Sequence, residues 1–199
     1  MRLEAEGLAA IRGGRTLFRD LSFAASGGEA VLISGPNGSG KTTLLRVLAG
    51  LLAPSAGRVV LAGSEDPVSE AVHFIGHLDA LKGMLPPEEN LTFHKNLFGG
   101  TGETVEAALT RVGLGALSRV PAGILSAGQR RRAALARLLV SHRPIWLLDE
   151  PANAIDTAGQ KLLAALMQEH RAGGGIVVAA THMRIELPGA TGISLGEKS

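Results

Sequence analysis

Gly35-Pro36-Asn37-Gly38-Ser39-Gly40-Lys41-Thr42 is the most informative stretch of this 199-residue sequence. It matches the pattern Gly-x-x-x-x-Gly-Lys-Ser/Thr of a phosphate-binding loop. An apolar run at 30–34 precedes it, and a helical pattern at 41–49 follows it and stops at Gly50. A strand, a glycine-rich loop and a helix in this order form the context in which such a loop binds nucleotide phosphates. The stretch therefore predicts a nucleotide-binding protein, against the alternative of a glycine-rich turn that matches by chance.

Each position of this loop has a chemical reason. Glycines allow backbone N–H groups to surround a phosphate, and the helix that follows directs its positive end toward the same point. Lys41 is expected to contact the β- and γ-phosphates, and the Thr42 hydroxyl is expected to ligate Mg²⁺. The candidate residues for binding ATP are the eight residues of the loop and Thr43.

Two acidic residues, Asp149 and Glu150, follow the apolar run at 145–148. A carboxylate at the carboxyl end of a central strand, beside a phosphate loop, can hold Mg²⁺ through its water shell. A neighbouring glutamate can orient or deprotonate an attacking water. The alternative is a solvated acidic pair at the start of a loop, because Pro151 follows directly. Beside a phosphate loop, the functional interpretation is favoured.

Strand and helix patterns alternate along the chain, which predicts the α/β fold class. The runs at 145–148 and 176–180 are apolar without interruption, as in strands buried on both faces of a parallel sheet. The predicted strands are residues 17–23, 30–34, 59–61, 71–75, 145–148 and 176–180. The predicted helices are residues 41–49, 88–97, 103–112 and 127–140.

Composition excludes several classes of function. The chain has no cysteine, which excludes disulfides, thiolate metal sites and cysteine nucleophiles. Its net charge of +2 gives no nucleic-acid footprint. Its first residues include Glu4 and Glu6, at positions where a signal peptide needs an apolar run. No apolar stretch approaches the ~18–20 residues that span a bilayer. We expect one soluble domain whose link to a membrane comes through a partner.

A third segment of interest is Leu125-Ser126-Ala127-Gly128-Gln129, before a helical pattern rich in Ala, Leu and Arg. Ser126 and Gln129 fit a capping box, so this segment is at least a good helix start. Gly128 costs about 1 kcal/mol in a helix, which indicates that another group approaches its backbone closely. The arginines that follow, Arg130–Arg132, are predicted to form a solvated helix face, with contact to a phosphate or a partner as the alternative.

Together these segments resemble the ATP-binding subunits of ABC transporters. That family has the phosphate loop, a Leu-Ser-Gly-Gly-Gln-like signature (here with Ala127), a strand ending in Asp-Glu, a loop with Asp156 and a switch histidine at His182, in this order. The resemblance implies one ABC ATPase domain over residues 1–199. It has a RecA-like parallel sheet core of the P-loop NTPase type, an antiparallel β edge and a helical signature subdomain at roughly 78–142.

The resemblance also implies a mode of assembly. Two copies would form a head-to-tail homodimer with two ATP molecules between them. Ser126 and Gly128 of one copy would close on the γ-phosphate held by the other. His182 would contact that γ-phosphate, and Asp156 would communicate across the interface.

Two positions depart from the family pattern. The aromatic residue that usually stacks on adenine falls near Arg12, and the chain has no tyrosine. Either the Arg12 guanidinium stacks on the base instead, or the site selects adenine only weakly. The glutamine that contacts Mg²⁺ is replaced by His77, a candidate neutral ligand or water partner. His73 and His77 would not share a face at the end of a strand, which argues against a dedicated transition-metal site.

With these departures and its short length, the sequence resembles the ATP-binding subunit of the heme exporter of cytochrome c maturation. The motifs that carry this resemblance are Arg15-Thr16-Leu17-Phe18, Leu21-Ser22-Phe23, Ile75-Gly76-His77, Leu81-Lys82, Glu89-Asn90-Leu91 and Leu125–Arg132. It implies ATP hydrolysis coupled to transport, multi-spanning membrane subunits as partners, and a peripheral location at the cytoplasmic face of the inner membrane. No direct binding of heme or nucleic acid is expected.

Some alternatives stay open at this point. Glu88 and Glu89 suit the first turn of a helix, or equally the surface that grips a membrane partner. The ATPase of another ABC exporter, or a soluble mechanical ABC ATPase acting on nucleic acid or ribosomes, is the second candidate function. A GTPase is disfavoured because the chain has no Asn-Lys-x-Asp motif for guanine.

Overall fold

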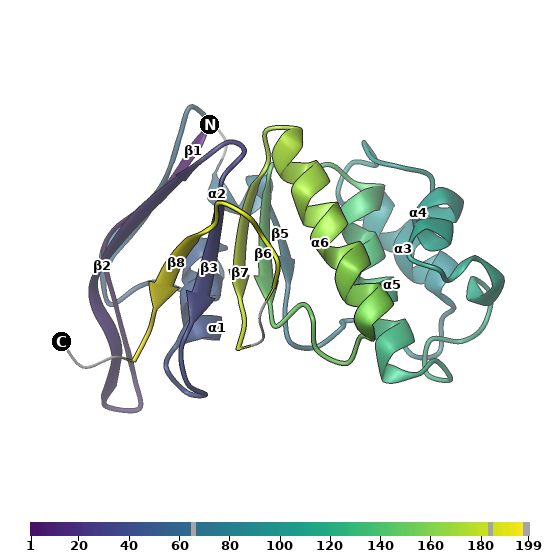
Figure 1. Cartoon of the computed structure of the whole chain (residues 1–199), viewed down its shortest axis with the longest axis horizontal. Helices are drawn as coiled ribbons and strands as arrows, with labels where there is room; N and C mark the ends of the chain where they lie inside the picture. The colour runs from purple at the N-terminus through teal and green to yellow at the C-terminus, as the bar shows by residue number, and fades with distance from the viewer. Residues whose placement is uncertain (65–66, 183–184, 197–199) are drawn as a thin grey trace. The chain divides into compact units, whose positions relative to one another are not determined.

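The structure is a computed structural model that describes residues 1–64, 67–182 and 185–196 (Figure 1). The chain divides into two compact units. The sheet unit contains residues 1–74, 143–150 and 166–199. The helical unit contains residues 75–142 and 151–165.

The sheet unit begins with a three-stranded antiparallel sheet in the order β2-β1-β4. The strands are β1 (Arg2–Arg12), β2 (Arg15–Ser26) and β4 (Ala56–Ala62). A two-residue turn joins β1 to β2, so Arg12 pairs with Arg15. Leu3, Ala5, Leu8 and Ala10 are buried along β1, as expected for a strand with one face on a core.

The second sheet of this unit has five strands in the order β5-β6-β7-β3-β8 (Figure 1). The pairings of β6 with β7, β7 with β3 and β3 with β8 are parallel. The strands are β3 (Ala30–Ser34), β5 (Val72–Ile75), β6 (Ile145–Asp149), β7 (Ile176–Ala180) and β8 (Thr191–Ser194). Every residue of β6 and β7 is buried. The prediction of an α/β fold with a parallel sheet is therefore confirmed.

The core of the sheet unit surrounds α1 (Lys41–Leu48), and its side chains come from α1 and from both sheets. Ile145 and Leu147 of β6 belong to this core. Trp146 lies between them in sequence and therefore on the other face of the sheet. There it stacks on His170 of α6 (Thr157–Ala172), with ring centroids 4.0 Å apart and an angle of 10° between the planes. Burial on both faces explains why β6 is apolar from Ile145 to Leu148, before it ends at Asp149.

The helical unit is built on α3 (Pro87–Leu97), α4 (Val105–Arg111) and α5 (Ala127–Val140), with a short 3₁₀ helix at Gly115–Leu117. α3 begins with Pro87 and two acidic residues, which favour a helix start. Thr104 caps α4 by accepting a hydrogen bond from the Ala107 N–H. The three helices begin and end within one or two residues of the predicted ranges.

Several elements were not predicted from the sequence. These are β1, α6, β8 and the single helical turn α2 (Val68–Ala71) before β5. Among the residues that the structure describes, no helix combines the length and apolar character needed to cross a bilayer.

Candidate functional site

The loop between β3 and α1 requires glycine for steric reasons. Gly35 and Gly40 have φ angles of 140° and 103°, which residues with a side chain rarely adopt. A Cβ atom on Gly35 would lie 2.3 Å from the Leu195 carbonyl oxygen, and one on Gly40 would lie 3.0 Å from Leu17 Cβ. The backbone of the loop therefore packs directly on neighbouring segments, and its N–H groups can turn inward as a phosphate cradle requires.

Lys41 extends its ammonium group back over the loop. Its Nζ donates hydrogen bonds to the carbonyl oxygens of Gly35 (2.8 Å) and Pro36 (3.4 Å), and the side chain is 7% exposed. Ser39 next to it has a buried hydroxyl that makes no hydrogen bond within the described residues. A buried cation and an unused buried hydroxyl in one loop fit an anionic ligand that would bind both.

Thr42 and Asp149 come together at the carboxyl edge of the parallel sheet. The Thr42 hydroxyl donates a 2.8 Å hydrogen bond to Asp149 Oδ2, and Asp149 is 1% exposed. A hydroxyl and a carboxylate are hard oxygen donors, and Mg²⁺ prefers such donors. The residues present therefore fit Mg²⁺ bound beside the phosphates.

Glu150 lies between Lys41 and His182. Its Oε1 lies 3.9 Å from Lys41 Nζ, and its Oε2 lies 2.9 Å from His182 Nδ1. Oε2 also accepts a 3.2 Å hydrogen bond from the His182 N–H. The carboxylate is largely buried, whereas the His182 side chain is 55% exposed. Such a carboxylate, held between an ammonium and an imidazole, can accept a proton from water and pass it toward solvent.

The helical unit holds the predicted signature segment. Ser126 Oγ accepts a hydrogen bond from the Gln129 N–H (3.2 Å), and Gln129 Oε1 accepts one from the Ser126 N–H (2.8 Å). The predicted capping box is present. A Cβ atom on Gly128 would lie 2.7 Å from the Ala154 carbonyl oxygen, so the group that approaches the Gly128 backbone belongs to the loop before α6. Ser126 itself stays exposed.

Of the remaining predicted site residues, Asp156, His77 and Arg12 lie at exposed positions. Asp156 precedes α6 and accepts a 2.8 Å hydrogen bond from the Gly159 N–H. His77 lies in the segment after β5, and Arg12 lies at the end of β1. Thr43 is half-buried in the first turn of α1. In the sheet unit the structure thus brings together the loop, Asp149, Glu150 and His182; Ser126, Gly128, Asp156 and His77 belong to the helical unit.

The prediction of a solvated face for Arg130–Arg132 is wrong for Arg131. Arg131 is 3% exposed, whereas its two neighbours are half-buried. A signal for this was present in the sequence, because Ala134, Leu135 and Leu138 follow at spacings of three, four and seven residues. That spacing places Arg131 on the apolar face of α5.

Comparison with known proteins agrees with this geometry. Residues 18–153 match the family model described as ABC transporter. The chain is similar to the cytochrome c biogenesis ATP-binding export protein CcmA of Rhodopseudomonas palustris strain HaA2, with 53% identity over 184 residues that cover 92% of each chain. It is 50% identical over 194 residues to the protein of the same name in Mesorhizobium japonicum, with 96% of each chain covered.

A solved structure is also similar over the whole length. It is an ABC transporter ATP-binding protein from Pyrococcus furiosus, with a TM-score of 0.86, 25% sequence identity and complete coverage of both chains. The phosphate loop, the Asp149–Glu150 pair and the match to these proteins lead to one conclusion: the chain belongs to the ABC transporter ATP-binding family, among the cytochrome c biogenesis ATP-binding export proteins.

Proposed function

We propose that this chain hydrolyses ATP to power the membrane exporter of cytochrome c maturation that handles heme. One observation carries the hydrolytic role. The buried Glu150 carboxylate lies between Lys41 Nζ and His182 Nδ1 at the end of the strand that also bears Asp149. This arrangement provides a proton acceptor, a phosphate-binding cation and a polar side chain at one edge of the sheet.

The proposed mechanism assigns one task to each residue. The loop N–H groups and Lys41 bind the β- and γ-phosphates and stabilise the charge that develops on them. Glu150 accepts a proton from the attacking water, and His182 orients the Glu150 carboxylate and contacts the γ-phosphate. Bound Mg²⁺ would neutralise phosphate charge; Thr42 and Asp149 would hold it, with His77 as a partner of its water shell.

Two copies of the chain are proposed to act together, head to tail. Ser126 is exposed at the start of α5, and the first turn of that helix contains no acidic residue. The free backbone N–H groups at the start of α5, and the positive end of the helix dipole, suit a γ-phosphate held by the other copy. Asp156 is proposed to contact the other copy, and Arg12 is proposed to stack on adenine, since both side chains are exposed.

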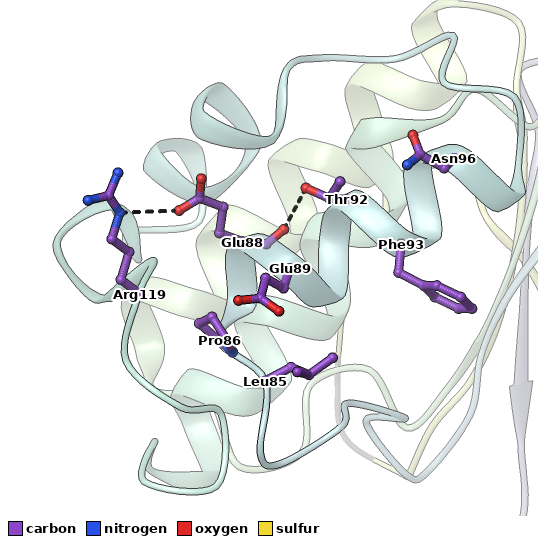
Figure 2. Close-up of a pocket in the computed structure, with 8 residues that line it drawn as sticks. All are labelled: Leu85, Pro86, Glu88, Glu89, Thr92, Phe93, Asn96 and Arg119. Atoms are coloured by element: carbon purple, nitrogen blue, oxygen red, sulfur yellow. Dashed lines mark hydrogen bonds and ion pairs between the residues drawn. The ribbon is translucent and has the colours of Figure 1, made fainter.

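A membrane subunit is proposed to dock on the helical unit. A pocket of about 670 Å³ lies along α3, and Figure 2 shows Glu88 facing Arg119 at one end and the Phe93 ring extending at the other. Exposed apolar side chains continue this surface, namely Met84 (90% exposed), Phe93 (56%) and Leu97 (62%). Apolar groups beside acids suit a short amphipathic segment of a multi-spanning subunit. The chain would then be peripheral, at the cytoplasmic face of the inner membrane.

The test replaces the phosphate-binding cation in the cell. Lys41→Ala should abolish the formation of c-type cytochromes while other heme proteins form normally, because heme is made but not handled by the exporter. Lys161→Ala, at an exposed lysine of α6, is the matched control and should have no effect. Normal c-type cytochromes in the Lys41→Ala strain would contradict the proposed function.

Partner capture tests the proposed docking surface separately. Affinity purification from detergent-solubilised membranes should recover multi-spanning subunits, and neither heme nor nucleic acid should purify with the isolated chain. Phe93→Glu should lower that recovery several-fold without changing ATP binding. Recovery of only ribosomes or DNA would instead support the soluble mechanical ATPase.

A further inference from the structure

Helix α5 carries a buried arginine, Arg131, that takes part in neither the capping box nor the phosphate site. Arg131 is 3% exposed and lies in the first half of α5, a helix with many buried apolar residues. A guanidinium group removed from water costs several kcal/mol unless charged or polar partners surround it. The position therefore depends on what the guanidinium contacts.

Its hydrogen-bond partners come from two segments that are distant in sequence. Nη1 donates a 2.8 Å hydrogen bond to the Gly76 carbonyl oxygen, 55 residues away. Nε donates a 3.2 Å hydrogen bond to the Pro151 carbonyl oxygen, 20 residues away. Asp79 Oδ1 lies 3.4 Å from Nη1 and offsets the charge. One planar side chain therefore ties together α5, the segment after β5 and the start of the loop after β6.

The pKa of a neighbouring side chain supports this placement of charge. Burial lowers the pKa of Arg137, six residues further along α5, and the positive charge of Arg131 adds to this effect. The carboxylate of Asp79 opposes both effects, and the resulting pKa is about 10. Arg131 is thus a fixed cation inside the helical unit, and Asp79 is positioned to balance it.

Both carbonyl groups are directly next to residues of the proposed chemistry. Gly76 precedes His77, and Pro151 follows Glu150, whose own φ angle is 48°. A non-glycine residue with such a φ is strained and needs support from the surrounding structure. The Pro151 carbonyl is the first backbone acceptor after that strained residue, and Arg131 holds it.

We propose that Arg131 is a positioning residue for ATP hydrolysis, which fixes the backbone beside His77 and beside Glu150 from the signature helix. The inference rests on the proposed ATP hydrolysis. Lysine cannot replace it, because a single ammonium does not present the planar fork that reaches two carbonyl groups at once. Displacing a catalytic group by about 1 Å can cost up to roughly 100-fold in rate.

The experiment compares variants of the full-length chain in its membrane complex. Arg131→Met should lower kcat about 10-fold or more, while the KM for ATP changes less than about threefold, because the phosphate loop is untouched. Arg131→Lys should recover only part of the rate. Asp79→Asn keeps both carbonyl contacts and should stay within about threefold of the wild type. Arg46→Met, at an exposed arginine of α1, is the control and should leave kcat and KM unchanged.

A purely structural role predicts a different result. It would lower thermal stability and the yield of folded protein but leave kcat per folded molecule within twofold of the wild type, and that result would overturn the inference. If Arg131→Met does not fold, Arg131→Lys decides between the two, because a folded lysine variant with wild-type kcat contradicts the positioning role.

Failure of the proposed function would give different results from failure of this inference. If the wild-type complex hydrolyses no ATP, or if Glu150→Gln is as active as the wild type, then the hydrolytic assignment is wrong. If those two results are as expected and only the Arg131 variants behave as the wild type, then the positioning inference alone is wrong.

Discussion

At the scale of single residues, the backbone of Glu150 is the most unusual feature of the site. Asp149 ends β6, and Glu150 then turns into the left-handed region with a φ of 48°, a conformation that costs a side-chain-bearing residue roughly 1–2 kcal/mol. Its N–H still donates a 2.8 Å hydrogen bond to the Ala180 carbonyl oxygen. The strand pairing therefore continues to Glu150 while the chain changes direction, and this directs two adjacent carboxylates to different partners.

The first residue-scale prediction concerns proton transfer. Glu150→Gln keeps the size of the side chain but cannot accept a proton from water, so ATP hydrolysis should fall about 100-fold or more. ATP binding should persist, and a nucleotide-bound dimer should accumulate, measured by size-exclusion chromatography with ATP. Glu106→Gln, at an exposed acid of α4, is the control. A monomer that hydrolyses ATP at the native rate would show that Glu150 is not the base.

The second residue-scale prediction concerns the binding of Mg²⁺. Thr42→Val removes the hydroxyl that donates to Asp149 Oδ2 at 2.8 Å and keeps the shape of the side chain. We expect the Mg²⁺ concentration for half-maximal ATP hydrolysis to rise about 10-fold or more. Thr42→Ser retains the hydroxyl and should restore the wild-type value. An unchanged Mg²⁺ requirement in the valine variant would exclude Thr42 as a ligand.

At the scale of elements, the loop before α3 depends on one amide side chain. Asn90 is 8% exposed, and its Oδ1 accepts a 2.8 Å hydrogen bond from the Lys82 N–H. Its Nδ2 lies within 3.1 Å of three carbonyl oxygens, those of Lys82, Leu85 and Pro86. A single side chain thus shapes the turn that leads from the exposed Met84 into α3.

Asn90→Ala should therefore destabilise the helical unit. It leaves the partly buried Lys82 N–H and three carbonyl groups without their partner, which costs about 2–3 kcal/mol in the free energy of unfolding. Urea unfolding followed by far-ultraviolet circular dichroism measures this change. Asn96→Ala, at an exposed position of the same helix, should change the free energy by less than about 0.5 kcal/mol. Equal stability of the two variants would refute the structural role of Asn90.

The elements that could be predicted from the sequence are those with a local signal. β3, β6 and β7 are short apolar runs, and α1, α3 and α5 have clear helix starts. β1 was missed because Glu4, Glu6 and Gly7 interrupt its apolar pattern, and its pairing with β2 and β4 is a long-range effect. β8 is a short and mostly exposed strand that is held by its pairing with β3 and by the packing of Ile193 on the core.

The candidate site divides in the same way. The phosphate loop and Asp149–Glu150 are contiguous motifs, so their chemistry can be predicted from the sequence. The contact of Gly128 with the Ala154 carbonyl and the burial of Arg131 arise from the folded chain. The sequence indicated only that Gly128 needs a close neighbour, and the neighbour itself is 26 residues away.

At the scale of the whole molecule, each of the two units holds some of the proposed functional residues. The sheet unit holds Lys41, Thr42, Glu150 and His182, and the helical unit holds Ser126. If Ser126 acts on nucleotide bound by a second copy, then one copy binds ATP without completing the hydrolytic site. Binding and hydrolysis should therefore be separable by mutation.

Ser126→Arg tests that separation. A bulky cation at the exposed start of α5 should block the approach of a second copy and abolish hydrolysis, while calorimetric titration shows ATP binding by the isolated subunit largely intact. Ser126→Ala loses the same helix cap without adding bulk, and should cost only about 1 kcal/mol of stability. Loss of ATP binding in Ser126→Arg would contradict the dimer model.

The stack of Trp146 on His170 has a spectroscopic consequence. The chain contains one tryptophan and no tyrosine, so its intrinsic fluorescence comes from this one indole, which is 4% exposed in the sheet unit. The indole stacks on the His170 ring at 4.0 Å, so its emission reports on this contact and on the integrity of β6. The helical unit, which holds the signature helix and the proposed docking surface, contributes no intrinsic signal, and its motions can be followed optically only after a label is attached there.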